Sequence, residues 1–320
     1  MQPTIQSNNK ILVIGAAGQI GVELTIALRK KNGNENVIAS DISAEPKILK
    51  GAGHWEEIDV LREGELYSKI VRNKITEVYL LAATLSATGE HDPHQAWKLN
   101  MGGLLNVLEI AKEEKLKVFW PSSIAASTPT STVYGISKYA GECWCQWYHD
   151  KFGVDVRSLR FPGLISYNTK PGGGTTDYAI DMFHAALEKK TYSCFLKPDT
   201  MLPMMYMPDA IRATLMLMDA PYERIENRMS YDIAAMSFTP IELYEKIKAF
   251  CPTFEIIYEP DSRQRIADSW PDSVGDIEAR EHWGWGPSWN LCTMTNDMLV
   301  KLDEIKLKST SQRLEEMGVI

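Results

Sequence analysis

The sequence lacks several features that mark particular protein classes. Charges or glycines interrupt its apolar stretches within about a dozen residues, so we expect no transmembrane span. The segment 1–10 is polar and lacks the apolar core of a secretory signal, and it is too short and arginine-poor for a transit peptide. No set of Cys, His and Asp residues has the spacing of a zinc site, so we expect no metal.

Cysteines are few, and basic residues are outnumbered by acidic ones. The 5 cysteines are an odd number and are scattered, which favours a reducing compartment over a disulfide framework. We therefore expect a cytoplasmic protein, with the mitochondrial matrix as the alternative. With 34 Lys and Arg against 42 Asp and Glu, the net charge of −8 argues against nucleic acid or an anionic membrane as a partner.

The first half of the chain alternates between strand-like and helix-like segments. Short apolar runs predict strands over residues 10–15, 36–41, 56–60, 77–82, 117–121 and 155–161. Helical spacing of apolar residues predicts helices over 19–31, 63–72, 95–113 and 133–152. Repeated strand–helix units predict an α/β fold of the Rossmann type, a doubly wound parallel sheet with helices on both faces.

The pattern changes after Phe161, where Pro162-Gly163 and the run 171–174 break regular structure. Helices are expected around 178–189, 209–218, 240–250 and 293–307, with strands near 230–234 and 255–258. Thr239 and Asp209 have the sequence context of helix N-caps. We therefore expect a Rossmann domain over residues 1–161 and a smaller C-terminal α/β lobe over 162–320 for substrate, with the chain free to cross back between them.

A glycine-rich turn follows the first expected strand. Gly15, Gly18 and Gly21 have the spacing G-x-x-G-x-x-G, and Gln19 and Ile20 open the next helix. Glycine lets the backbone approach a pyrophosphate, which then meets the N–H groups at the start of the helix. In isolation the same motif also occurs as an ordinary tight turn. Its position between strand and helix favours a dinucleotide site.

Asp41 ends the second expected strand, 20 residues after Gly21. A carboxylate at this position accepts hydrogen bonds from the adenosine ribose hydroxyls and repels a 2′-phosphate, so it predicts NAD rather than NADP. A solvated loop acid is the alternative. Further cofactor contacts are expected at the ends of the third and fourth strands, from Asp59, Val60, Leu81, Ala82 and Ala83. Ala82 and Ala83 would equally suit close packing of a helix on the sheet.

Tyr134 and Lys138 form a Y-x-x-x-K motif in an expected helix, where the i, i+4 spacing places both side chains on one face. A free tyrosine has a pKa of about 10. A nearby ammonium favours the phenolate, which suits a general base. Ser122 and Ser123 follow the preceding strand, where a hydroxyl would hold the substrate oxygen. A surface Tyr/Lys pair is the alternative, but these motifs and Asn100 occur in the order that a dehydrogenase needs.

Beyond these short motifs, longer stretches with a characteristic sequence are spread over nearly the whole chain. They are LLAATLSATGE (80–90), WPSSIAA (120–126), STVYGISK (131–138), RFPGLIS (160–166), GGGTTDYA (172–179), MYMPDA (205–210), FTPIEL (238–243) and ADSWPDS (267–273). On these residues the chain resembles the extended short-chain dehydrogenases/reductases, which include UDP-galactose 4-epimerase. Within that branch it is similar to the metal-independent L-threonine 3-dehydrogenases.

The resemblance implies NAD-dependent oxidation of the L-threonine 3-hydroxyl to 2-amino-3-oxobutyrate by a homodimer. It implies that Tyr134 is the base and that Asn100, Tyr134 and Lys138 join the cofactor site. The small lobe suits an amino acid, since hydroxyls after a glycine run fit a carboxylate and an acid fits an ammonium. The expected substrate contacts are Ser86, Ser123, Tyr134, Thr175, Thr176 and Asp177. For Asp177, capping the following helix is an equal alternative.

Two other functions stay open at this point. A nucleotide-sugar epimerase or dehydratase would use the same fold, but the compact Thr-Thr-Asp run favours a small amino acid. A non-catalytic NAD-sensing regulator would not need the pair Tyr134 and Lys138. Ser123 and Tyr134 are only 11 residues apart, closer than in other extended members. Segment 126–132 is therefore either a trimmed active-site loop or what remains of a mobile loop absent from this sequence.

Overall fold

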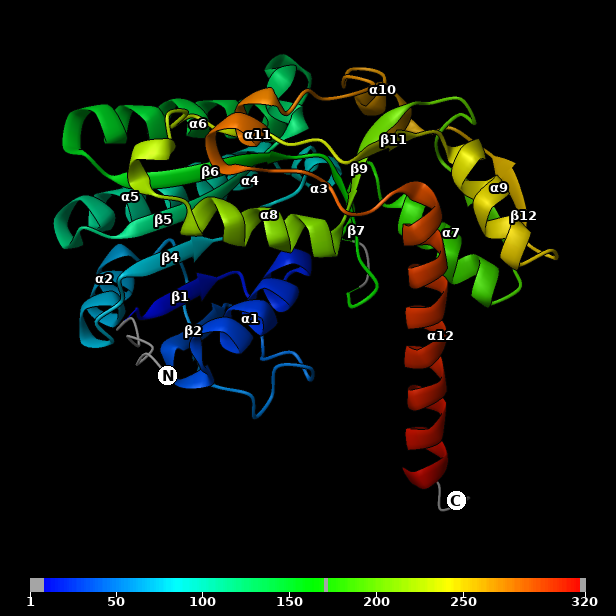
Figure 1. Ribbon diagram of the computed structural model, residues 1–320, viewed down its shortest axis with the longest axis horizontal. Coiled ribbons are helices and arrows are strands. Elements are labelled where there is room, and N and C mark those ends of the chain that lie inside the picture. Colours follow the sequence, from blue (N-terminus) through cyan, green and yellow to red (C-terminus); the bar gives the residue numbers. More distant parts are fainter. Residues whose placement is uncertain (1–8, 170–171, 317–320) are drawn as a thin grey trace.

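The central element is a seven-stranded sheet, seen in the computed structural model of Figure 1, which describes residues 9–169 and 172–316. Every neighbouring pair of its strands is parallel. Their order is β10 (Tyr231–Asp232), β6 (Asp155–Phe161), β5 (Lys117–Ser123), β4 (Glu77–Leu80), β1 (Ile11–Ile14), β2 (Val37–Asp41) and β3 (Trp55–Glu57). This order confirms the Rossmann fold.

Helices cover both faces of this sheet, because successive side chains of a strand point to opposite sides. In β1, Ile11 and Val13 belong to one apolar core, and Leu12 and Ile14 belong to the other. The first core packs under α1 (Gln19–Asn32), α8 (Met207–Asp219) and α11 (Ile277–Trp283). The second packs under α2 (Glu63–Arg72), α5 (Gly103–Glu114) and α6 (Val133–Phe152).

A third core holds the smaller lobe together. One of its sheets has the order β11 (Met236–Phe238), β9 (Leu202–Tyr206), β7 (Gly163–Ile165), and the other pairs β12 (Glu255–Tyr258) with β8 (Thr191–Cys194). Its helices are α7 (Tyr178–Leu187), α9 (Pro240–Phe250), α10 (Ser262–Ala267) and α12 (Leu291–Glu316). The far end of α12 stands away from the rest of the molecule (Figure 1). Over the described ranges, no helix is long and apolar enough to cross a membrane.

The chain does not remain in the smaller lobe after residue 161. Helix α8 packs beside α1 on the Rossmann sheet, and β10 pairs with β6 at its edge, Tyr231 opposite Leu159. The segment from α8 to β10 therefore returns to the first sheet before the chain enters the small lobe again. The expected boundary at residue 161 stays a prediction.

Several local expectations need correction. The third strand is Trp55–Glu57, so Asp59 and Val60 lie beyond it. The helix expected over 95–113 is divided into α4 (Pro93–Trp97), a π-helical turn (Lys98–Gly102) and α5, with the short α3 (Ser86–Gly89) before them. The polar segment 1–8 and Pro171 lie outside the described residues.

One of the two expected helix caps is confirmed and the other is wrong. Thr239 caps α9 in a capping box with Glu242. Asp209 lies inside the first turn of α8, because that helix begins at Met207. The carboxylate of Asp209 instead accepts hydrogen bonds from the backbone N–H groups of Ser288 and Trp289, so it anchors a loop of the small lobe.

Candidate active site

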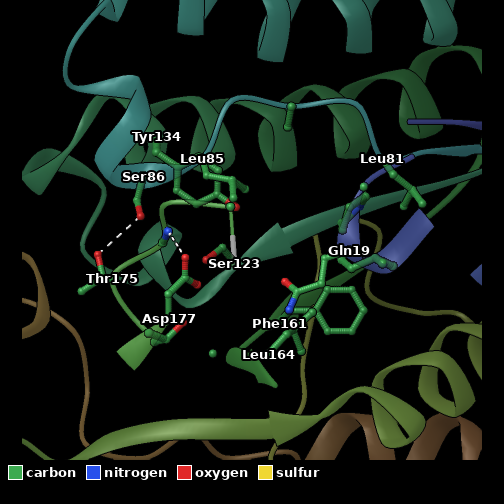
Figure 2. Close-up of a pocket in the computed structure, with 18 of the residues that line it drawn as sticks. Gln19, Leu81, Leu85, Ser86, Ser123, Tyr134, Phe161, Leu164, Thr175 and Asp177 are labelled. Carbon is green, nitrogen blue, oxygen red and sulfur yellow. Dashed lines mark hydrogen bonds between the residues drawn. The ribbon is translucent and has the colours of Figure 1, made fainter. Parts of the chain in front are cut away.

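A cavity of about 370 Å³ lies where the carboxyl ends of β1, β4 and β5 face the small lobe. In open α/β sheets this is the usual place for a ligand. Figure 2 shows Gln19 and Leu81 on one side of the cavity, Ser86, Thr175 and Asp177 on the other, and Ser123 between them. The glycine loop, the start of α6 and the segment before α7 complete the wall.

Two glycines of the loop, Gly15 and Gly21, are packed too tightly to carry a side chain. A Cβ on Gly15, whose φ is +88°, would lie 2.6 Å from the backbone N of Ala82. A Cβ on Gly21 would lie 2.2 Å from the carbonyl oxygen of Gly15. Gln19 lines the cavity, and its buried Nε2 has no hydrogen-bond partner among the described residues. Close backbone approach and a free donor at the start of α1 fit a dinucleotide pyrophosphate.

Asp41 supports this loop from the end of β2. Its Oδ2 accepts a hydrogen bond from the backbone N of Ala17 at 3.1 Å, and its Oδ1 accepts one from Ser43 at 3.0 Å. The carboxylate is therefore held at the edge of the glycine loop, the position expected of a group that binds the adenosine ribose. The loop contact was not predicted from the sequence.

The expected contacts at the end of β4 divide into two groups. Leu81 and Ala83 line the cavity with Gly18 and Ile20. Ala82 does not line the cavity, and its backbone lies against Gly15, where it leaves no room for a Cβ on that glycine.

Four other expected cofactor residues do not line the cavity, and Asp41 is one of them. Asp59 Oδ1 accepts a hydrogen bond from Leu61 N at 3.0 Å in a turn, and Val60 is buried against Gly103. The buried Asn100 holds the loop after β4 in place, because its Oδ1 accepts a hydrogen bond from Thr84 N at 2.8 Å. Its Nδ2 donates to Ser137 Oγ at 3.1 Å, which ties that loop to α6.

The pair of Tyr134 and Lys138 lies on the face of α6 that borders the cavity. Burial raises the pKa of Tyr134 to about 12, and a hydrogen bond with Ser123 acts in the opposite direction. Burial lowers the pKa of Lys138 to about 7. Lys138 Nζ donates to the carbonyl oxygen of Pro121 at 2.6 Å and lies 4.4 Å from the centre of the Trp120 ring. Burial therefore outweighs the lowering of the tyrosine pKa that the sequence suggests.

Ser122 and Ser123 both border the cavity, but their hydroxyls have different partners. Ser123 borders the cavity, accepts a hydrogen bond from Ala125 N at 3.2 Å and bonds to Tyr134. The hydroxyl of Ser122 points into the protein and donates to Glu142 Oε1 at 2.5 Å. Ser123 is thus the serine that can hold a substrate oxygen.

Ser86 of α3 and the segment before α7 in the small lobe together supply a polar group on the cavity wall. The hydroxyls of Ser86 and Thr175 are 3.4 Å apart, and Thr176 lies next to them on the cavity wall. Asp177 is at the N-cap position of α7 but does not cap that helix. Its Oδ2 accepts hydrogen bonds from the backbone N–H groups of Gly173 and Gly174, at 2.8 and 2.7 Å. Burial raises the pKa of this carboxyl.

Two further polar side chains line the cavity and were not predicted as site residues. Thr169 Oγ1 and Trp270 Nε1 are buried and have no hydrogen-bond partner within the described part of the chain. Trp270 lies in the stretch ADSWPDS, which could have indicated it. No pattern in the sequence singles out Thr169.

Comparison with known proteins agrees with this geometry. The L-threonine dehydrogenase of Cupriavidus necator has a solved structure that is 54% identical, with a TM-score of 0.89, over 92% of this chain and 99% of that one. The L-threonine dehydrogenase of Clostridium difficile is 44% identical, with a TM-score of 0.89, over 92% and 98%. An uncharacterized epimerase/dehydratase of Staphylococcus saprophyticus is 45% identical over 91% of this chain and 96% of its own length. Residues 11–234 match the model of the NAD dependent epimerase/dehydratase family, so the chain belongs to this family and is an NAD-dependent enzyme.

Proposed function

We propose that this enzyme oxidises L-threonine at its 3-hydroxyl to 2-amino-3-oxobutyrate and reduces NAD. The observation that carries the proposal is that one cavity joins three groups: the glycine loop, the pair of Tyr134 and Ser123, and the polar group around Thr175 and Asp177. The identity to proteins named L-threonine dehydrogenases supports the same substrate.

The small lobe, together with Ser86 of α3, would bind the two charged ends of the amino acid. Asp177 presents a buried carboxylate, which suits the ammonium. The hydroxyls of Ser86, Thr175 and Thr176 would donate to the carboxylate, with Trp270 Nε1 as a further donor. A small amino acid satisfies these groups, and this favours threonine over a nucleotide sugar.

The chemistry would take place between Tyr134 and the glycine loop. NAD, when bound, supplies the acceptor for the hydride from C3. Tyr134 Oη removes the proton from the 3-hydroxyl, while Ser123 Oγ holds the same oxygen by a hydrogen bond. Lys138 Nζ lies 5.5 Å from the centre of the Tyr134 ring, so its ammonium would stabilise the phenolate and hold the nicotinamide ribose.

The test is to add L-threonine and NAD to the purified protein and follow NADH by its absorbance. We expect NADH to form with L-threonine, and Tyr134→Phe serves as the matched control. Interconversion of UDP-sugars with no net NADH would support the epimerase instead. NAD binding without turnover of either substrate would support the regulator.

We also propose a homodimer formed through α6. The outer face of this helix exposes Ile136, Tyr139, Trp144 and Trp147, which lie three to five positions apart and form an apolar stripe. The five cysteines are free thiols, which fits the cytoplasm, with the mitochondrial matrix as the alternative.

A further inference from the structure

The Y-x-x-x-K pair belongs to a longer row of side chains on α6. Tyr134, Lys138 and Glu142 are spaced four residues apart, so they lie on one face over successive turns. Each of them bonds to one of three consecutive residues at the end of β5. The contacts are Ser123 with Tyr134, the carbonyl of Pro121 with Lys138, and Ser122 Oγ with Glu142.

Glu142, the third member of this row, is fully buried. Its Oε1 accepts hydrogen bonds from Ser122 Oγ at 2.5 Å and from Arg160 Nε at 2.7 Å, and its Oε2 accepts one from Arg160 Nη2. Arg160 Nη1 also pairs with Asp232 at 3.4 Å. A buried carboxylate is stable as a charge only with such partners, so this one is held in a fixed position.

We propose that Glu142 is a positioning residue for the catalytic pair, an inference that rests on the proposed function. By holding the hydroxyl of Ser122, Glu142 fixes the end of β5. On one side of Ser122, the carbonyl of Pro121 accepts a hydrogen bond from Lys138. On the other side, the hydroxyl of Ser123 bonds to Tyr134. Glu142 itself does not touch the substrate.

Glu142 also acts on the charge of Lys138. Burial lowers the pKa of Lys138, whereas Cys145 and Glu142 raise it. From β5, the Pro121 carbonyl and the Trp120 ring face this ammonium, and from α6 it is faced by Tyr134, Glu142 and Cys145. Behind Glu142 lie Arg160 of β6 and Asp232 of β10. Removing the charge of Glu142 therefore lets Lys138 lose its proton at lower pH, and the Tyr134 phenolate then loses its nearby positive charge.

Glu142→Gln tests the proposal against Asp232→Asn, which makes the same acid-to-amide change at the outer end of the same network. We expect the rise of kcat with pH to lie about one pH unit higher in Glu142→Gln than in the parent, while Asp232→Asn keeps the parental profile. Glu142→Asp keeps the charge but is one methylene shorter. It should keep the rise of kcat at the parental pH and lose kcat at every pH, because Ser122 is no longer held.

A direct titration of Lys138 separates this inference from the proposed function. The lysine ε-carbon can be labelled with ¹³C and assigned with Lys138→Met, and its NMR shift follows the ammonium without any turnover. The midpoint should be about one pH unit lower in Glu142→Gln than in the parent and unchanged in Asp232→Asn. An unchanged midpoint in Glu142→Gln, with only a lower Tm, would make Glu142 merely structural. A parent that makes no NADH from L-threonine would overturn the proposed function instead.

Discussion

Among single side chains, Tyr134 has the most direct role in the proposed chemistry. Tyr134→Phe keeps the ring and removes only the hydroxyl, so packing beside Lys138 survives. General-base catalysis contributes roughly 10²- to 10⁴-fold, and we expect kcat to fall by about that factor while the Kd for NAD stays near the parental value. Steady-state kinetics measure kcat, and calorimetry measures the Kd for NAD. Near-parental turnover would mean that another group is the base.

The pH dependence follows from the same pair. Tyr134 works only after losing its proton, and burial raises its pKa, so kcat should rise with pH. Lys138→Met removes the ammonium that favours the phenolate, and this should move the rise to higher pH. A kcat–pH series on parent and variant measures the shift. A rise at the same pH in both proteins would show that Lys138 has no electrostatic effect on the base.

Asp41 is expected to select the cofactor. Asp41→Asn keeps the shape of the side chain but removes its charge, which should weaken NAD binding by about tenfold and narrow the preference over NADP. Because Asp41 Oδ2 also accepts a hydrogen bond from Ala17 N, part of this loss comes from the glycine loop. A competition experiment with NAD and NADP measures the ratio of the two affinities in the parent and in the variant. Equal use of NADP by the parent would contradict the assignment of Asp41.

At the scale of elements, the junction of β1 and α1 allows a sharp test. A Cβ at Gly21 would meet the backbone of Gly15 and Ala16 at 2.2 to 2.9 Å, so Gly21→Ala must push the loop and the helix apart. We expect a loss of about 1–3 kcal/mol in stability and of more than about tenfold in NAD affinity. Thermal unfolding and NAD titration measure the two effects.

Gly64→Ala is the matched control, because a Cβ there, on α2, meets nothing within 4 Å. It should leave NAD binding unchanged and add about 0.5–1 kcal/mol of stability, since alanine favours the helix. If Gly21→Ala binds NAD as well as this control does, the close packing of the glycine loop is not needed for the cofactor.

Elements with a strong local pattern were predictable from the sequence. The buried parallel strands are nearly continuous apolar runs, and β6 begins and ends where expected. The strands β7, β8, β9 and β11 are only three to five residues long and were missed, because short segments carry too few residues for a period. The π-helical turn before α5 was missed because its residues keep helical spacing.

The same limit applies to the candidate site. The glycine loop and the Tyr134–Lys138 pair depend on fixed local spacing, so they could be found by reading along the chain. Thr169 and Trp270 reach the cavity only through the folding of the small lobe. Glu142 has a local spacing too, but its role depends on contacts with β5 and β6 that no spacing reveals.

For the whole molecule, the apolar stripe on α6 predicts an oligomer. We expect a solution mass of about twice the 36.1 kDa of one chain, measured by light scattering during size exclusion. Trp144→Glu places a charge in the stripe and should yield monomers, whereas Ile305→Glu, on the exposed part of α12, should not. A monomeric parent would contradict the dimer.

The return of β10 to the first sheet has a consequence for synthesis on the ribosome. Strand β6 has its outer edge unpaired until residues 231–232 have left the exit tunnel. By then β7, α7, β8 and β9 of the small lobe have already emerged. An open strand edge invites wrong pairing, so the nascent chain must keep that edge free while residues 162–230, which include these small-lobe elements and α8, pass by. The Rossmann sheet therefore gains its last strand only after part of the small lobe has been synthesised, so the two lobes cannot fold strictly one after the other.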